Sequence, residues 1–241
     1  MYGHRARIGY TSPPSTTEVF PYEFYKIAPE GVTLVITTLA IMKLTSSEVD
    51  QSYEISLRAA EQMAETKIDL MIFGGVPINV SRGISNVDSL IAETEQKIGV
   101  PVTTSLSAQM NGLNALGAKK VGIIHPFADG TSQDKMHFDC LEHYGFELTA
   151  IKGAGRPAVE LGLIPSSTPL EIARSLKSQH PEIDTISFPC PHWAVSELID
   201  PLQKELGVNV VTALQTIVWE ALRRCGIKDQ INGFGRLLKE C

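Results

Sequence analysis

The sequence predicts an α/β protein made of two pseudo-symmetric halves, each a mostly parallel sheet flanked by helices, with an active-site cleft between them. Two observations favour this fold class. Short runs rich in β-branched residues alternate with longer segments of helical period, which is typical of βαβ units. An internal repeat also relates the two parts of the chain, so each part predicts the same series of strands and helices.

The predicted strands are short and almost wholly apolar. This pattern is typical of strands in a parallel sheet that is covered on both faces, because neither face then alternates with polar residues. The predicted strands are Arg7–Tyr10, Val32–Thr37, Leu70–Phe73, Val102–Thr104, Lys120–Ile124, Leu148–Ile151, Thr185–Phe188 and Asn209–Thr212.

Helices are predicted between these strands. The longest runs from Glu48 to Lys67, and Ser47 is expected to cap it, because a serine oxygen can accept a hydrogen bond from the unpaired N–H groups of the first turn. Further helices are predicted at Val87–Ile98, Leu106–Leu116, Gln133–Tyr144, Pro169–Gln179, Ala194–Leu206 and Ala213–Cys225.

The internal repeat appears in three places at similar offsets. Residues 7–14 parallel residues 120–127, residues 68–77 parallel residues 183–192, and residues 99–106 parallel residues 207–214. These matches predict a first lobe of residues 1–105 plus 213–241 and a second lobe of residues 106–212, both within the usual size of a domain.

Ligands of parallel α/β sheets bind beyond the carboxyl ends of the strands, where loops present side chains and backbone N–H groups. Two such halves facing each other would enclose a cleft. Its walls are expected to come from matched loops at strand ends, which are Ser12–Pro14, Gly74–Pro77, His125–Phe127 and Cys190–His192.

The charge balance limits the classes of partner. The formal net charge is −6, so neither nucleic acid nor an anionic membrane would be attracted to the surface, and a small organic molecule is the expected ligand. No segment approaches the ~18 apolar residues of a membrane span, and the N-terminus lacks the apolar core of a signal peptide. A cytoplasmic protein is expected, and the sequence leaves open whether it forms an oligomer.

The four cysteines, at positions 140, 190, 225 and 241, show neither CxxC spacing nor a paired Cys/His set. We therefore expect no metal site, no disulfide framework and reduced thiols. A glycine-rich stretch at residues 153–156 lacks the GxGxxG pattern, so no dinucleotide cofactor is expected either.

Cys190 is the main candidate for chemistry, because it directly follows a predicted strand and begins a loop that leads to a helix. A helix N-terminus or the nearby imidazole of His192 could bring the thiol pKa towards neutrality, which favours proton transfer. A buried structural cysteine is the alternative. Likewise His125 and His192 could be hydrogen-bonded loop residues, and Gly74 with Gly75 could simply allow a tight turn.

In the repeat, the residue that matches Cys190 is Gly75. The chain resembles the aspartate/glutamate racemase superfamily, whose pseudo-symmetric halves carry one cysteine each. A glycine in the first position and a cysteine in the second resemble the arylmalonate decarboxylase family, which is related to maleate cis-trans isomerase. The resemblance extends through Ser81-Arg82-Gly83, residues 111–117 and the tail of residues 233–238.

The resemblance implies decarboxylation of a small malonate-like dicarboxylate without a cofactor, in which one carboxylate is held by donors, CO2 is lost, and Cys190 protonates the enediolate. It also implies a binding site in which hydroxyl residues and glycines donate hydrogen bonds to the substrate. This chain departs from that pattern: Val76 and Pro77 replace hydroxyl residues, Phe127 replaces a tyrosine, and Pro191 with His192 replaces a pair of glycines. The implied substrate-binding residues are Thr11, Ser12, Pro14, Gly75, Val76, Phe127, Pro191 and His192.

Two alternatives stay open from the sequence. One is a maleate cis-trans isomerase or a racemase of a small carboxylate, although the missing first cysteine removes the second base that a racemase needs. The other is a non-catalytic carboxylate-binding protein that keeps the duplicated cleft.

Overall fold

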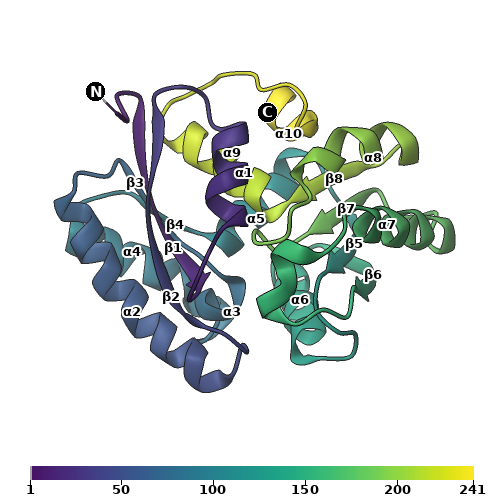
Figure 1. Cartoon of the computed structure of the whole chain (residues 1–241), viewed down its shortest axis with the longest axis horizontal. Helices are drawn as coiled ribbons and strands as arrows, with labels where there is room; N and C mark the ends of the chain where they lie inside the picture. The colour runs from purple at the N-terminus through teal and green to yellow at the C-terminus, as the bar shows by residue number, and fades with distance from the viewer. Residues whose placement is uncertain (1) are drawn as a thin grey trace. The chain divides into compact units, whose positions relative to one another are not determined.

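The computed structural model describes residues 2–241, which form two compact units (Figure 1). The first contains the segment ending at Thr17, Ala28–Ala108 and Glu220–Lys228. The second contains the three remaining segments, Glu18–Ile27, Gln109–Trp219 and Asp229–Cys241. Each unit holds one four-stranded parallel sheet, so the predicted fold class is confirmed.

The units differ from the lobes expected from the repeat. Residues 18–27, 213–219 and 229–241 were assigned to the first lobe but make their contacts in the second unit, and residues 106–108 belong to the first. The cause is side-chain packing that the repeat does not encode. Gly235, for example, donates its N–H to Asp200 Oδ1 at 2.7 Å, which attaches the C-terminal segment to the second unit.

The strand orders of the two sheets are equivalent. The first sheet has the order β2-β1-β3-β4 and the second has the order β6-β5-β7-β8, with every pair parallel. The strands are β1 (Ala6–Pro14), β2 (Val32–Ile41), β3 (Leu70–Phe73), β4 (Val102–Thr104), β5 (Lys120–His125), β6 (Glu147–Gly153), β7 (Thr185–Phe188) and β8 (Asn209–Thr212).

One pair of aspartates shows the repeat at atomic level. Asp69, just before β3, accepts the N–H of Arg7 at 2.8 Å and donates its own N–H to the Arg7 carbonyl at 2.8 Å. Asp184, just before β7, makes the same two bonds with Lys120, at 2.9 and 3.0 Å. Each aspartate therefore fixes the register between the two central strands of its sheet.

Helices cover these sheets, and α2 and α4 pack together on the first sheet (Figure 1). In the second unit α7 and α8 pack together, with α7 on β5 and β6 and α8 on β8, while α6 lies against β6. The helices are α1 (Val19–Ile27), α2 (Ser46–Glu65), α3 (Val76–Asn79), η1 (Ile84–Asn86), α4 (Val87–Ile98), α5 (Ser105–Ala115), α6 (Ser132–His143), η2 (Ala158–Leu163), α7 (Ser167–Gln179), η3 (Ser196–Leu198), α8 (Ile199–Leu206), α9 (Ala213–Arg224) and α10 (Gly235–Glu240).

Every predicted strand is present, and most predicted helices begin and end within two residues of their predicted bounds. The predicted helix Ala194–Leu206 is instead a 3-10 turn followed by α8. Three α-helices were not predicted, namely α1, α3 and α10. Within residues 2–241, no helix is both long enough and apolar enough to span a bilayer.

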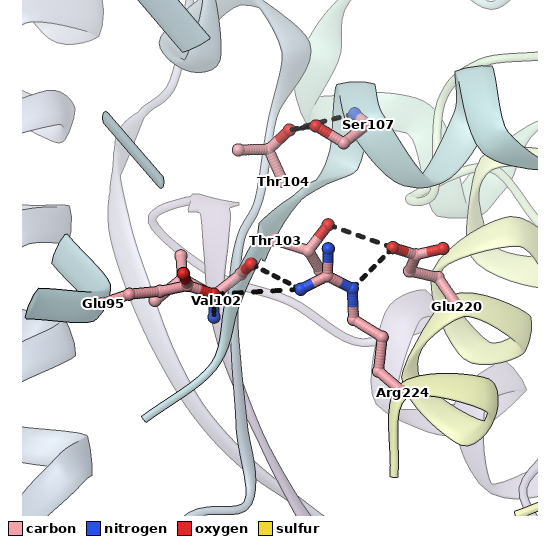
Figure 2. A network of polar contacts seen from close by, with 7 residues as sticks. All are labelled: Glu95, Val102, Thr103, Thr104, Ser107, Glu220 and Arg224. Atoms are coloured by element: carbon pink, nitrogen blue, oxygen red, sulfur yellow. Dashed lines mark hydrogen bonds and ion pairs between the residues drawn. The ribbon is translucent and has the colours of Figure 1, made fainter. Parts of the chain in front are cut away.

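A polar network holds the end of α9 against β4 in the first unit (Figure 2). Arg224 donates to Glu220 Oε1 at 2.9 Å and to the Val102 carbonyl at 2.9 Å. Glu220 in turn accepts from Thr103 Oγ1 at 3.4 Å, and Glu95 accepts the Val102 N–H at 2.7 Å. The network fixes β4, and α5 begins directly after that strand.

The N-terminus of α2 is closed by a capping box, but Ser47 is not the cap, so that prediction is wrong. Thr45 Oγ1 accepts the Glu48 N–H at 3.3 Å, and Glu48 Oε2 accepts the Thr45 N–H at 3.0 Å. Two otherwise unpaired donors of the first turn are thereby satisfied. Ser47 lies inside the helix and contacts only the Thr45 hydroxyl, at 3.2 Å, among the hydrogen bonds seen at this turn.

Replacing Thr45 with alanine removes this cap, so we expect Thr45→Ala to lower the free energy of unfolding by about 1 kcal/mol. The matched control is Ser47→Ala, which keeps the cap and should change stability by less than about 0.5 kcal/mol. Urea unfolding followed by circular dichroism measures both. An equal or larger loss in Ser47→Ala would contradict the assignment of Thr45 as the cap.

Candidate active site

The first group of predicted site residues lies at the carboxyl end of the first sheet. Thr11 and Ser12 are near the end of β1, and Thr11 is in register with Phe73, the last residue of β3. Gly74 and Gly75 follow directly. Thr11 Oγ1 accepts the Gly74 N–H at 3.1 Å, so the two strand ends are joined at the point where the loop after β3 begins.

Ser12 offers an unused hydroxyl at this edge. Its side chain is fully buried, and among residues 2–241 its Oγ has no hydrogen-bond partner. A buried hydroxyl without a partner is costly, so a ligand oxygen in this place would satisfy it. Thr11 is equally buried and keeps its hydroxyl proton for donation, because its oxygen acts as an acceptor in the bond from Gly74.

Gly75 occupies a place that suits only glycine. Its φ is +83°, and a Cβ atom added to it would lie 2.5 Å from Cγ of Pro13. Its carbonyl accepts the N–H groups of Ile78 and Asn79, each at 3.0 Å, and so begins α3. Val76 is the first residue of this short helix and is buried, while Pro14, the last residue of β1, is partly buried.

Asn79 supports this loop and was not found from the sequence. Its amide nitrogen donates to the Phe73 carbonyl at 3.2 Å, and its Oδ1 accepts the Leu106 N–H at 3.3 Å. One buried side chain thus ties the end of β3 to the start of α5. The available signal was an amide residue within an apolar run, Val76 to Val80, which has no place in a core unless it is hydrogen-bonded.

The second group of site residues lies at the carboxyl end of the second sheet. Phe127 follows β5 by two residues, and its loop is held by backbone bonds: Gly155 donates to the Phe127 carbonyl at 2.9 Å, and Arg156 to the Pro126 carbonyl at 2.8 Å. A Cβ atom on Gly153 would lie 2.2 Å from the Phe127 carbonyl oxygen. The glycine-rich stretch therefore serves to fix this loop.

Cys190 lies two residues beyond β7, in the position that Gly75 holds beyond β3. Cys190 is half-buried, and desolvation of its thiol raises the pKa to about 12. The backbone N–H groups of His192 and Trp193 oppose this rise only in part. The shift towards neutrality that the sequence allowed is not seen, because desolvation outweighs the two donors and the imidazole of His192 makes no contribution. The sulfur is therefore a protonated thiol at neutral pH.

The residues after Cys190 close the loop against the core. The Trp193 ring meets Phe188 edge-on at 5.9 Å between centroids, and both are buried within one apolar cluster. His192 is also buried, with its ring centroid 5.8 Å from that of Phe20. Burial lowers the pKa of His192 to about 3, so the imidazole is neutral, and its Nε2 has no hydrogen-bond partner among residues 2–241.

Glu23, on α1, was also missed by sequence reasoning. It is 3% exposed and accepts from the Ser196 N–H at 3.3 Å and from Ser196 Oγ at 2.8 Å. Burial raises the pKa of Glu23 against the effect of these donors. Together with Phe20, it places α1 against the loop that carries Cys190 and His192. The spacing of Phe20, Phe24 and Ile27, one helical face, was the signal that could have found α1.

The structure thus gathers Thr11, Ser12, Pro14, Gly75 and Val76 at one sheet edge and Phe127, Cys190, Pro191 and His192 at the other. Each group combines apolar walls with uncharged donors. Neither group contains a charged side chain of its own. This composition suits a small anionic molecule that is held by hydrogen bonds rather than by ion pairs.

Comparison with known proteins extends these observations. The sequence matches the arylmalonate decarboxylase family over residues 8–238. It is 23% identical over 235 residues to an arylmalonate decarboxylase from Bordetella bronchiseptica, with 97% of this chain and 96% of that protein covered. It is also 23% identical over 245 residues to a maleate isomerase from Geobacillus stearothermophilus, with 96% of each covered.

A solved structure supports the same fold. The crystal structure of a doubly substituted arylmalonate decarboxylase in its liganded form superposes with a TM-score of 0.89 at 22% identity. The superposition covers 98% of this chain and all of the other.

The conformation of Gly75 gives a testable consequence. We expect Gly75→Ala to lower the free energy of unfolding by about 2 kcal/mol or more. The positive φ accounts for roughly 1 kcal/mol of this loss, and the contact with Pro13 accounts for the rest. Gly99→Ala is the matched control, because Gly99 also has a positive φ but nothing lies within 4 Å of its added Cβ. Urea unfolding compares them. Equal losses would show that Pro13 does not restrict this position.

Proposed function

The chain belongs to the arylmalonate decarboxylase family, and we propose that it is a cofactor-independent decarboxylase of a small malonate-like dicarboxylate. Cys190 is the proton donor in this proposal. The substrate is bound by Thr11, Ser12, Pro14, Gly75, Val76, Phe127, Pro191 and His192.

The observation that carries the proposal is the position of Cys190, two residues beyond β7, where the equivalent residue beyond β3 is Gly75. Burial also raises the pKa of this thiol to about 12, which favours its protonated form. A lone acid is sufficient for decarboxylation, because only one proton is delivered to the α-carbon. A raised pKa keeps that proton on the sulfur until a strongly basic carbon is formed.

The reaction follows from the surroundings of the two groups. One substrate carboxylate accepts hydrogen bonds from the hydroxyls of Thr11 and Ser12, while the other lies against apolar walls such as Val76 and Phe127. An ionised carboxylate in an apolar environment is destabilised relative to neutral CO2, so the C–C bond breaks and its electron pair moves into the enediolate. The donors stabilise the charge that develops on the retained carboxylate.

Protonation completes the reaction. The Cys190 sulfur transfers its proton to one face of the α-carbon, which gives the monocarboxylate and leaves a thiolate that water reprotonates. Gly75 contributes no side chain, and so leaves room for the substituent of the substrate. His192, neutral and with an unpaired Nε2, is suited to hydrogen-bond a substrate oxygen without adding charge.

Isomerisation of maleate is the second candidate, because a maleate isomerase is as similar in sequence as the decarboxylase is. Addition of Cys190 to a double bond requires a thiolate, and burial disfavours that form. Racemisation requires a second base, which glycine at position 75 does not supply. A carboxylate-binding protein without turnover is the third possibility, and the NMR experiment described below tests it together with the other two.

The proposed reaction also sets the conditions in which the protein works. Its thiol must stay reduced, and all four cysteines, 140, 190, 225 and 241, are free of disulfides. A reducing compartment such as the cytoplasm fits this requirement. The partner that we propose is the small carboxylate itself, and a net charge of −6 disfavours nucleic acid.

Proton NMR in D2O separates the candidate reactions. With phenylmalonate and methylphenylmalonate we expect loss of CO2 and monocarboxylates that carry deuterium at the α-carbon. Conversion of maleate to fumarate would instead identify an isomerase, and deuterium exchange into a chiral monocarboxylate without CO2 loss would identify a racemase. A thermal shift with these ligands but no turnover would identify a binding protein.

Substitution of the thiol tests the assigned residue. Cys190→Ser should lower kcat at least about 100-fold, the usual contribution of a positioned proton donor, with circular dichroism unchanged. Cys225→Ser is the matched control, because burial also raises the pKa of that half-buried thiol, to about 11, and it lies outside both groups of site residues. Full turnover by Cys190→Ser would refute the assignment.

The dependence of the rate on pH tests the protonation state. The proton donor must be a thiol, and its pKa of about 12 lies far above the usual value of 9.0. We therefore expect no fall in kcat/KM from ionisation of Cys190 between pH 7 and 9.5, since deprotonation begins only near the raised pKa. A buried, protonated thiol would be contradicted if kcat/KM of the unmodified chain fell by half near pH 8 to 9 and the residual activity of Cys190→Ser showed no such fall.

A further inference from the structure

A histidine and two aspartates converge in the connection between β5 and α6, which also carries Phe127. His125 is the last residue of β5, Asp129 lies in the loop, and Asp134 lies in the first turn of α6. One ligand atom of each lies within 4.8 Å of the others. Cysteine spacing, on which the expectation of no metal site rested, carries no information about such a set.

His125 is completely buried, yet neither of its ring nitrogens makes a hydrogen bond with residues 2–241. Nε2 and Asp134 Oδ1 lie 2.9 Å apart as an ion-pair contact, and neither atom makes a hydrogen bond of acceptable geometry within residues 2–241. Buried polar atoms that remain unpaired are costly, and a bound ion is one of the few ways to satisfy both at once.

The spacing of these atoms suits a shared ion. Two ligands that bind one ion at about 2.1 Å and at right angles lie about 3.0 Å apart. The 2.9 Å between His125 Nε2 and Asp134 Oδ1 agrees with this value. Asp129 is exposed, and its carboxylate would exchange the contact with Lys152 for the ion to become the third protein ligand.

Backbone donors already orient both carboxylates. The Gly130 N–H donates to Asp134 Oδ2 at 2.8 Å, which leaves Oδ1 directed at His125. The Gly153 N–H donates to Asp129 Oδ1 at 2.5 Å, and the Lys152 ammonium contacts Asp129 Oδ2. The Gly130 contact lies on the far side of the Asp134 carboxylate, and contacts of this kind are typical of metal sites, where they fix the orientation of a ligand.

We propose that His125, Asp129 and Asp134 form a binding site for a divalent first-row transition-metal ion. An imidazole among the ligands favours such an ion over Mg2+ or Ca2+, which prefer oxygen ligands alone. Two carboxylates against one lysine leave a net negative charge that a divalent cation compensates.

The bound ion would tie the end of β5 to the first turn of α6 and to the end of β6. This connection carries Phe127, whose ring centroid is 6.2 Å from that of His125. The ion has no role in the proton transfer assigned to Cys190. The proposal of this site does not rest on the proposed function, and its test does not require turnover.

Co2+ is a suitable probe for the full-length chain, because its visible d–d absorption reports coordination and a strong near-ultraviolet band would reveal sulfur ligands. We expect one equivalent to bind without the sulfur band, and to raise the midpoint of thermal unfolding. Asp134→Asn should weaken binding at least about tenfold, while its side-chain oxygen can still accept the Gly130 N–H. Asp139→Asn is the control on the same helix, since Asp139 pairs only with Lys135 among the ion pairs seen there, and it should bind as the unmodified chain does.

The proposal requires the unmodified chain to bind Co2+ saturably with a dissociation constant below about 100 μM. Its absence would overturn the proposal whether or not the variants fold. Binding that Asp134→Asn leaves unchanged, or that shows the sulfur band, would overturn it as well, because the ion would then lie elsewhere.

Discussion

Parallel pairing of the two central strands in each sheet decides where every predicted site residue lies. The carboxyl ends of β1 and β3 are adjacent because Thr11 pairs with Phe73, and β5 pairs with β7 in the same way. Asp69 and Asp184 fix this register through paired backbone bonds. A slip by one residue would turn each side chain to the opposite face, so the loops could no longer present the same groups.

Burial gives the loop after β7 an uncharged character. Desolvation raises the pKa of Cys190 and lowers that of His192, so the thiol keeps its proton and the imidazole does not gain one. It also raises the pKa of Glu23, although the Ser196 donors oppose the rise. Neutral surroundings would leave a substrate carboxylate without a counter-ion, and this is the condition under which loss of CO2 becomes favourable.

Much of the fold could be predicted from the sequence, because strands and long helices are recorded in local hydrophobic patterns. Capping was predicted less well: the hydroxyls of Thr45 and Ser47 stand two residues apart, and only the structure shows which oxygen faces the Glu48 N–H. Helix α1 was missed because Pro21 interrupts its aromatic pattern, and its place in the second unit depends on contacts across the chain.

The candidate site was predicted through the repeat, since matched positions after equivalent strands led to Cys190 and Gly75. Residues that support the loops could not be found in this way. Glu23 reaches Ser196 across 173 residues of sequence, and Asn79 reaches Leu106 across 27. Their polar side chains carry no local pattern, so their role becomes visible only when the partner is brought close by the fold.

The difference between the two halves lies in the backbone as well as in one side chain. Gly75 has a positive φ and faces the Pro13 ring, whereas Cys190 is not among the non-glycine residues with positive φ within residues 2–241. A cysteine at position 75 would need both a different backbone conformation and a displaced proline. The conformation of this loop therefore suits glycine at position 75, which agrees with the single proton donor that we propose.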